Sequence, residues 1–83
     1  MRAQDLLPDD SNQLEMKGVN VRKGTIGAFL ANARVLRDQN VSAAARAAAE
    51  RDIIEALPAL RAIGLFEVLQ IRDPKLKDFV DRH

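Results

Sequence analysis

The chain has 83 residues, of which 47% are hydrophobic and 30% charged, and its 13 basic and 12 acidic residues give a net charge of +1. This composition is too apolar and too balanced in charge for an intrinsically disordered chain, and the length allows one domain with a small core. The absence of cysteine excludes disulfides and thiolate metal sites and favours a cytoplasmic setting. Because no stretch approaches the roughly 20 apolar residues of a membrane span, we expect no membrane partner.

Residues 1–12 are predicted to form a loose N-terminal arm, because their Pro8, Asp9 and Asp10 are typical of turns and no apolar period is sustained. Residues 13–83 are then expected to form a single compact domain. This domain begins with apolar residues at positions 14, 16, 19 and 21, which alternate as in a half-buried strand. Since Gly18 interrupts the alternation, the pattern indicates either a strand with a glycine bulge or a tight hairpin.

Two helices are predicted to follow and to pack as an antiparallel hairpin. The first begins at Gly24 and Thr25, with Thr25 as its N-cap. Ser42 caps the second, Pro58 is expected to kink or restart it, and Gly64 ends it as a left-handed cap. Each helix repeats apolar residues on one face; these are Ile26, Phe29, Leu30, Ala33 and Leu36 in the first, and Ala45, Ala49, Ile53, Leu57 and Leu60 in the second.

The remaining residues are predicted to add a strand and a helix. Phe66 to Arg72 is apolar and β-branched enough to pair with the first strand, and Asp73 followed by Pro74 is a strong helix start. We therefore expect a mostly helical α+β fold in the order strand, helix, helix, strand, helix, with the helical hairpin packed on a small two-stranded sheet. Such a sheet is marginal alone, so either the helices cover it or a second copy pairs with it, and we predict a homodimer on this ground.

The sequence supplies few groups for catalysis or metal binding. The only histidine, His83, is the last residue, and the chain has no tyrosine, tryptophan or cysteine. The acids between positions 50 and 55 share a helix with Arg46 and Arg51, each of which lies four residues before a glutamate, so ordinary i,i+4 pairs account for these charges. We predict no catalytic residue, no metal site and no cofactor, and hence a protein that is not an enzyme.

One cluster has the composition of an anion-binding site. Arg22 and Lys23 precede Gly24 and Thr25 at a predicted helix start, where free backbone N–H groups can meet a phosphate or a carboxylate. Lys17 begins the acid-free basic stretch that contains this cluster. The alternative interpretation is structural, with Thr25 as the cap, Gly24 in the turn and both cations solvated.

The aromatic residues favour a protein partner over nucleic acid. All three of them, Phe29, Phe66 and Phe79, occupy core-like positions, so none is left as a platform for stacked bases. Our leading interpretation is a small interaction or regulatory protein with an unknown protein partner. The second is a binder of a phosphate-bearing ligand or of nucleic acid through the basic 17–37 segment, which adds Arg34 and Arg37 to the cluster above.

The first half of the chain also carries a resemblance to other proteins. Residues 14–33 read LEMKGVNVRKGTIGAFLANA, and this stretch resembles part of a small bacterial family of proteins of unknown function. The resemblance implies a bacterial, cytoplasmic setting, and it implies no activity or site.

Overall fold

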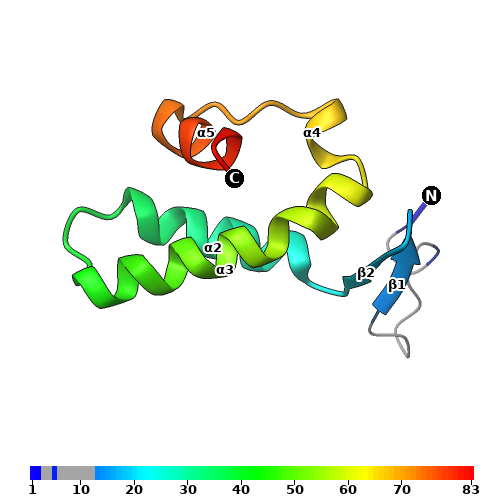
Figure 1. Ribbon diagram of the computed structural model, residues 1–83, viewed down its shortest axis with the longest axis horizontal. Helices are drawn as coiled ribbons and strands as arrows, with labels where there is room; N and C mark the ends of the chain where they lie inside the picture. Colours follow the sequence, from blue (N-terminus) through cyan, green and yellow to red (C-terminus); the bar gives the residue numbers. More distant parts are fainter. Residues whose placement is uncertain (3–4, 6–12) are drawn as a thin grey trace.

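The structure is a computed structural model that describes residues 1–2, 5 and 13–83, in which a β-hairpin precedes the helices (Figure 1). Strands β1 (Gln13–Met16) and β2 (Val19–Arg22) pair antiparallel, with Leu14 opposite Val21 and Met16 opposite Val19. Of the two interpretations that the sequence allowed here, the tight hairpin is therefore the right one. The predicted arm over 1–12 lies largely outside the described residues.

The hairpin turn and its apolar face explain why these residues form a sheet. Lys17 and Gly18 make the turn with φ angles of 51° and 77°, the left-handed pair that matches the twist of a two-residue hairpin loop. The four apolar side chains of the register share one face. Val21 on that face is buried, and β2 lies against α3 (Ala43–Ala62), so the helical hairpin covers the sheet as one of the predicted alternatives requires.

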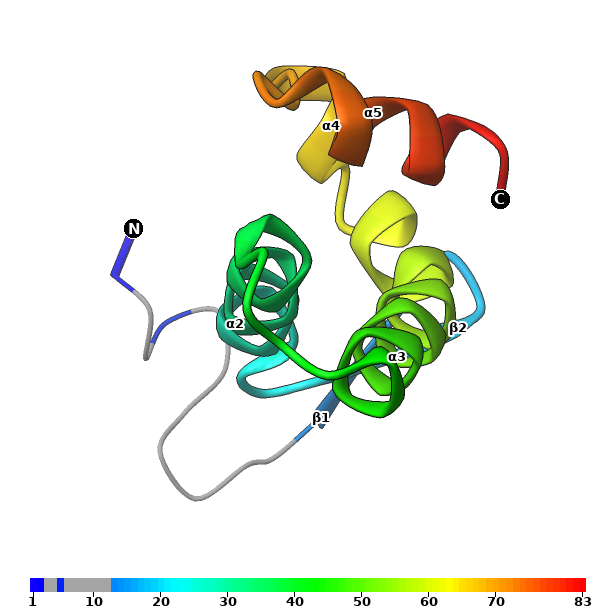
Figure 2. The same cartoon turned by 90° about the vertical axis from the view of Figure 1, so that its left-hand side faces the viewer.

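Helices α2 (Thr25–Arg37) and α3 lie side by side as the predicted antiparallel hairpin (Figures 1 and 2). Ser42 is the N-cap of α3, as predicted, and its hydroxyl accepts a hydrogen bond from the backbone N–H of Ala45 at 3.0 Å. The guanidinium of Arg46 joins the two helices, donating to the carbonyls of Leu36 at 2.9 Å and Asp38 at 3.1 Å. These bonds satisfy carbonyls that the end of α2 leaves without a helical partner.

The core is centred on α3 and is closed by the C-terminal helix. Ile53, Leu57 and Leu60 of α3 pack with Phe29 of α2 and Val80 of α5 (Pro74–Asp81). Figure 2 shows α5 and the short helix α4 (Leu65–Val68) on one side of the helical hairpin. None of the described helices combines the length and the apolar character that a membrane crossing needs.

One detail of the predicted helices is wrong. Thr25 is not the N-cap of α2, because Gly24 takes that position at a φ of 87°, which glycine adopts without strain; the Thr25 hydroxyl donates instead to the carbonyl of Arg22 at 2.6 Å. Helix α3 continues through Pro58 to Ala62 without the restart that was one alternative there, and the kink, the other alternative, stays a prediction. Both Pro58 and Ile54 are exposed, so the carbonyl that proline leaves without a donor belongs to the solvent side of the helix.

The strand predicted over 66–72 is also wrong, although the sheet has two strands. Gly64 adopts a φ of 82° and starts the helical turn α4, in which the N–H of Leu69 bonds the carbonyl of Leu65 at 2.9 Å. The residues that follow, 69–72, form no ladder with the hairpin. The physical reason is that β1 and β2 pair across a two-residue loop, which costs far less chain entropy than pairing with a segment over forty residues away.

Candidate functional site

A groove lies between α2 and residues 65–74, and we call it the α2 groove. It has a volume of about 600 Å³. Helix α2 forms one wall, and α4 with the extended chain leading to α5 forms the other. Figure 1 shows the path of these segments. The wall formed by 65–74 exists because Gly64 turns the chain back along α2.

Two contacts fix how the walls face each other. At one end, the rings of Phe29 and Phe66 meet edge to face with centroids 6.0 Å apart. At the other end, Nε of Arg37 lies 3.4 Å from Oδ2 of Asp73. The 65–74 wall therefore runs in the same direction as α2, and the eight helical steps from Phe29 to Arg37 span about 12 Å at the rise of an α-helix.

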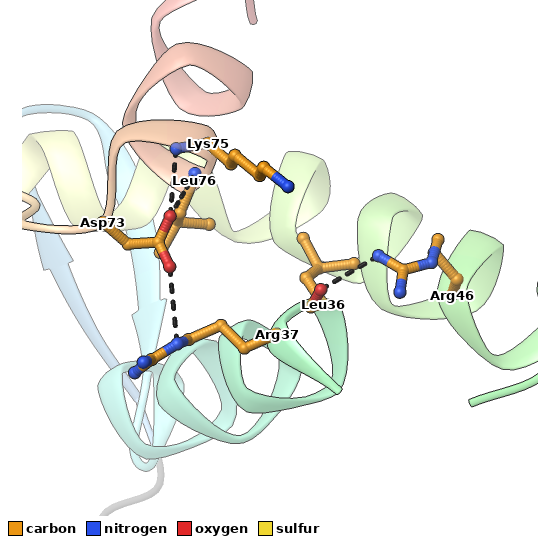
Figure 3. A network of polar contacts seen from close by, with 6 residues as sticks. All are labelled: Leu36, Arg37, Arg46, Asp73, Lys75 and Leu76. Atoms are coloured by element: carbon orange, nitrogen blue, oxygen red, sulfur yellow. Dashed lines mark hydrogen bonds and ion pairs between the residues drawn. The ribbon is translucent and has the colours of Figure 1, made fainter. Parts of the chain in front are cut away.

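Asp73 has two roles at the Arg37 end of the groove, and Figure 3 shows its polar contacts. Its Oδ1 accepts hydrogen bonds from the backbone N–H groups of Lys75 at 2.9 Å and Leu76 at 3.2 Å, so it is the N-cap predicted for α5. Its Oδ2 faces Arg37. One carboxylate thus starts α5 and anchors it to the last turn of α2.

The walls of the groove expose apolar side chains. Leu30 of α2 is 53% exposed, Leu69 of the opposite wall is 60% exposed and Ile26 is 41% exposed, whereas Phe29 between them is buried. Ile26 and Leu30 were predicted to face the core, and this prediction is wrong. A contiguous set of exposed apolar side chains on a small domain is typical of a binding surface.

The rim of the groove is cationic. Arg34, Arg37 and Arg72 line it, and Asp73 is the one acid among its described lining residues. Asp73 already pairs with Arg37, whereas the guanidinium groups of Arg34 and Arg72 have no hydrogen bond or ion pair with any residue that the structure describes. The groove therefore combines apolar walls with two uncompensated guanidinium groups.

The structure separates the basic 17–37 segment into two parts. Lys17 lies in the hairpin turn and Arg22 ends β2, next to Gly24 and Thr25 at the start of α2. Arg34, in contrast, lies ten residues beyond Gly24, roughly 15 Å along the helix. Only the second part, with Arg37, reaches the α2 groove.

The anion-binding cluster predicted at the start of α2 stays a prediction. Gly24 offers no side-chain cap and the first turn of α2 has no acid, which leaves the backbone N–H groups there without a side-chain acceptor. However, Arg22 lines a depression together with Asp52 and Glu55 of α3, whose charges oppose an anion.

The α2 groove was not predicted from the sequence. Arg34 and Arg37 were singled out for their charge, whereas Leu69 and Arg72 were predicted to lie on a strand. The left-handed cap at Gly64 signals that the chain reverses after α3, but nothing in the sequence shows that the following residues lie along α2.

The acids of α3 are arranged differently from the prediction. Arg46 bonds backbone carbonyls and does not pair with Glu50, and Nε of Arg51 lies 3.9 Å from Oδ1 of Asp52 with no pair to Glu55. Within the described ranges, no three acidic or histidine side chains gather as a metal site would require. The terminal His83 packs its ring on Phe79, with centroids 4.7 Å apart.

The α2 groove is suited to binding. Guanidinium groups stay charged at neutral pH and donate hydrogen bonds in a fixed planar geometry, and the apolar walls gain free energy when they are covered. Comparison with known proteins adds no relative to this description, because no family model, curated protein or solved structure matches the chain.

Proposed function

We propose that this chain is a non-enzymatic interaction domain that binds a helix of a partner protein in the α2 groove. The observation that carries the proposal is the exposure of apolar side chains on both walls, 53% for Leu30 and 60% for Leu69. Burying such side chains contributes about 25 cal/mol for each Å² removed from water. A partner that covers the apolar side chains of both walls at once gains this free energy from each wall.

The shape of the groove favours a helix over a small molecule. Small-molecule sites are enclosed and bury most of the ligand surface, whereas the apolar side chains here stand half in solvent along a wall formed by a straight helix. Helices of partner proteins commonly dock their apolar faces into grooves of this kind. The α2 wall from Ile26 to Arg37 spans about 16 Å, which matches three turns of a docked helix.

Site-specific photo-crosslinking tests the proposal. A benzoylphenylalanine replaces Leu30 in one variant and Leu69 in a second, and Ala47, exposed on α3 and outside the groove, serves as the control position. We expect the same protein to be crosslinked from Leu30 and from Leu69, and not from Ala47. Absence of any crosslink from both wall positions would overturn the proposal, and a crosslink to a second copy of the chain would replace the partner with a homodimer.

A charged substitution on the wall provides the matched affinity test. Leu30→Glu places a carboxylate in the groove without disturbing the core, because Leu30 is already half exposed. Binding of the crosslinked partner is expected to weaken at least tenfold, about 1.4 kcal/mol, and Ala47→Glu should leave it unchanged. Equal binding by both variants would place the interface elsewhere.

The homodimer and the cytoplasmic setting stay predictions. The sheet is covered on its apolar face by α3, but its two strands of four residues still have outer edges that a second copy can pair with. Light scattering at several protein concentrations measures the mass of the protein in solution and hence its oligomeric state. A mass near 9.2 kDa throughout would contradict the homodimer.

A further inference from the structure

The α2 groove changes character along its length. Its Phe29 end is apolar, with Ile26 and Leu30 on the α2 wall, while its Arg37 end holds Arg34 and Arg72. This end has three cations and one acid, and the acid, Asp73, lies 3.4 Å from Arg37, which leaves a net positive charge. A docked segment must therefore match an apolar half and a positively charged half.

Resting on the proposed function, we infer that the occupant is an amphipathic helix whose first turn is acidic and whose following turns are apolar, packed antiparallel to α2. Carboxylates of its first turn face Arg34 and Arg72, which have no pair with any described residue of their own chain. Its apolar face covers Leu30 and Leu69. Arginine suits this role because its planar guanidinium binds a carboxylate with two parallel hydrogen bonds.

The direction of the occupant follows from two electrostatic arguments that agree. The C-terminus of α2 lies at the Arg37 end and has the negative end of the helix dipole, so the positive N-terminus of a second helix is favoured beside it. Acidic residues stabilise a helix in its own first turn. The arginines require the acidic first turn of the occupant, and the dipole of α2 favours its N-terminus. Both arguments therefore place the N-terminus of the occupant at the Arg37 end.

Three synthetic helical peptides of about 14 residues, roughly 21 Å long, test this inference. All share one leucine face with three-and-four spacing; the first has acids in its first turn, the second has lysines there, and the third has the acids in its last turn. Fluorescence anisotropy measures their affinities for the full chain. We expect the first peptide to bind about tenfold more tightly than either of the others, since each exposed charge pair changes affinity only a few-fold.

Charge reversal on the protein makes the test specific. In the double variant Arg34→Glu and Arg72→Glu, the preference should invert, with the lysine peptide binding more tightly than the acidic one. Lys17→Glu changes the same kind of charge in the hairpin turn and should leave the preference intact. Both positions in the double variant are exposed, so the fold is expected to persist and circular dichroism confirms it.

Each outcome separates this inference from the proposed function. If the acidic and lysine peptides bind equally, and both lose binding in Leu30→Glu, the charge inference is overturned while the groove function stands. If the first and third peptides bind equally, the direction is overturned. If no peptide binds, or if the acidic peptide binds Leu30→Glu unchanged, both the inference and the proposed function fail.

Discussion

Leu60 shows how much of the stability of this small domain depends on single side chains. It is 0% exposed, and it packs with Leu57 and Val80 where α3 meets α5. Leu60→Ala is expected to lower the free energy of unfolding by about 2–5 kcal/mol, because the deleted methyl groups leave a cavity that the helices fill only in part. Urea denaturation measures the change.

Leu69→Ala is the matched control for this prediction. Leu69 is 60% exposed on the groove wall, so the same chemical change should alter stability by less than about 0.5 kcal/mol. Equal losses in the two variants would mean that the core is not centred on α3. The comparison also separates residues that stabilise the fold from residues that bind a partner, since Leu69→Ala should weaken binding of the partner while the fold stays stable.

Two glycines with different backbone conformations predict opposite effects of the same substitution. Gly64 has a φ of 82°, so Gly64→Ala is expected to destabilise the fold by about 1–2 kcal/mol through left-handed strain. An added Cβ would also lie 2.9 Å from Oε2 of Glu67, which a flexible side chain can relieve.

Gly27, in contrast, is inside α2, and an added Cβ meets nothing within 4 Å. Gly27→Ala should therefore stabilise the fold by about 0.5–1 kcal/mol, the usual helix preference for alanine. Thermal unfolding of both variants measures the change in stability, which should be a loss for Gly64→Ala and a gain for Gly27→Ala. A stabilising Gly64→Ala would show that the turn into α4 does not need the left-handed conformation.

At the scale of elements, local signals in the sequence were sufficient for α2, α3 and α5, and insufficient for the segment 66–72, whose first residues lie in α4 and not in the predicted strand. Ser42 and Asp73 cap α3 and α5 as predicted, because capping is decided within three residues. The segment 66–72 has a strand-like composition, but its pairing partner was already taken by the adjacent hairpin strand. Composition shows that a segment can form a strand, but the length of the connecting loop decides which segment pairs with β1.

Asp73 links the capping of α5 to its attachment on α2, and two substitutions separate these roles. Asp73→Asn keeps the cap and removes the ion pair with Arg37, whose side chain is 66% exposed, so a loss of at most about 1 kcal/mol is expected. Asp73→Ala removes both and should cost about 1 kcal/mol more. Hydrogen exchange at the amides of Lys75 and Leu76 measures the fraying of α5.

Arg37→Gln is the control for the ion pair, because it leaves the cap in place. It should match Asp73→Asn in stability and in exchange at the start of α5. If Asp73→Asn frays the helix as much as Asp73→Ala does, the ion pair rather than the cap starts α5.

At the scale of the whole molecule, the groove is the feature that sequence patterns could not supply. Its walls come from residues 26–37 and 65–74, and the apolar period of α2 marked Leu30 for the core in the same way as Phe29. Only the path of the chain after Gly64 decides that Phe29 is covered while Leu30 is left at the groove. A helix face wider than its partner surface is indistinguishable from a core face in sequence.

Because the two walls belong to different parts of the chain, an occupant of the groove should couple them. A ligand that binds only when both walls are in place stabilises that state by about 2.7 kcal/mol at a hundred times its Kd. With the acidic-first peptide at that concentration, the amide of Leu69, bonded to Leu65 at 2.9 Å, is expected to exchange up to about 100-fold more slowly. Slower exchange in α2 alone would mean that the peptide lies on that helix without reaching the other wall. Leu30→Glu, which is expected to bind the peptide at least tenfold more weakly, should show at most about a tenth of the slowing at the same peptide concentration.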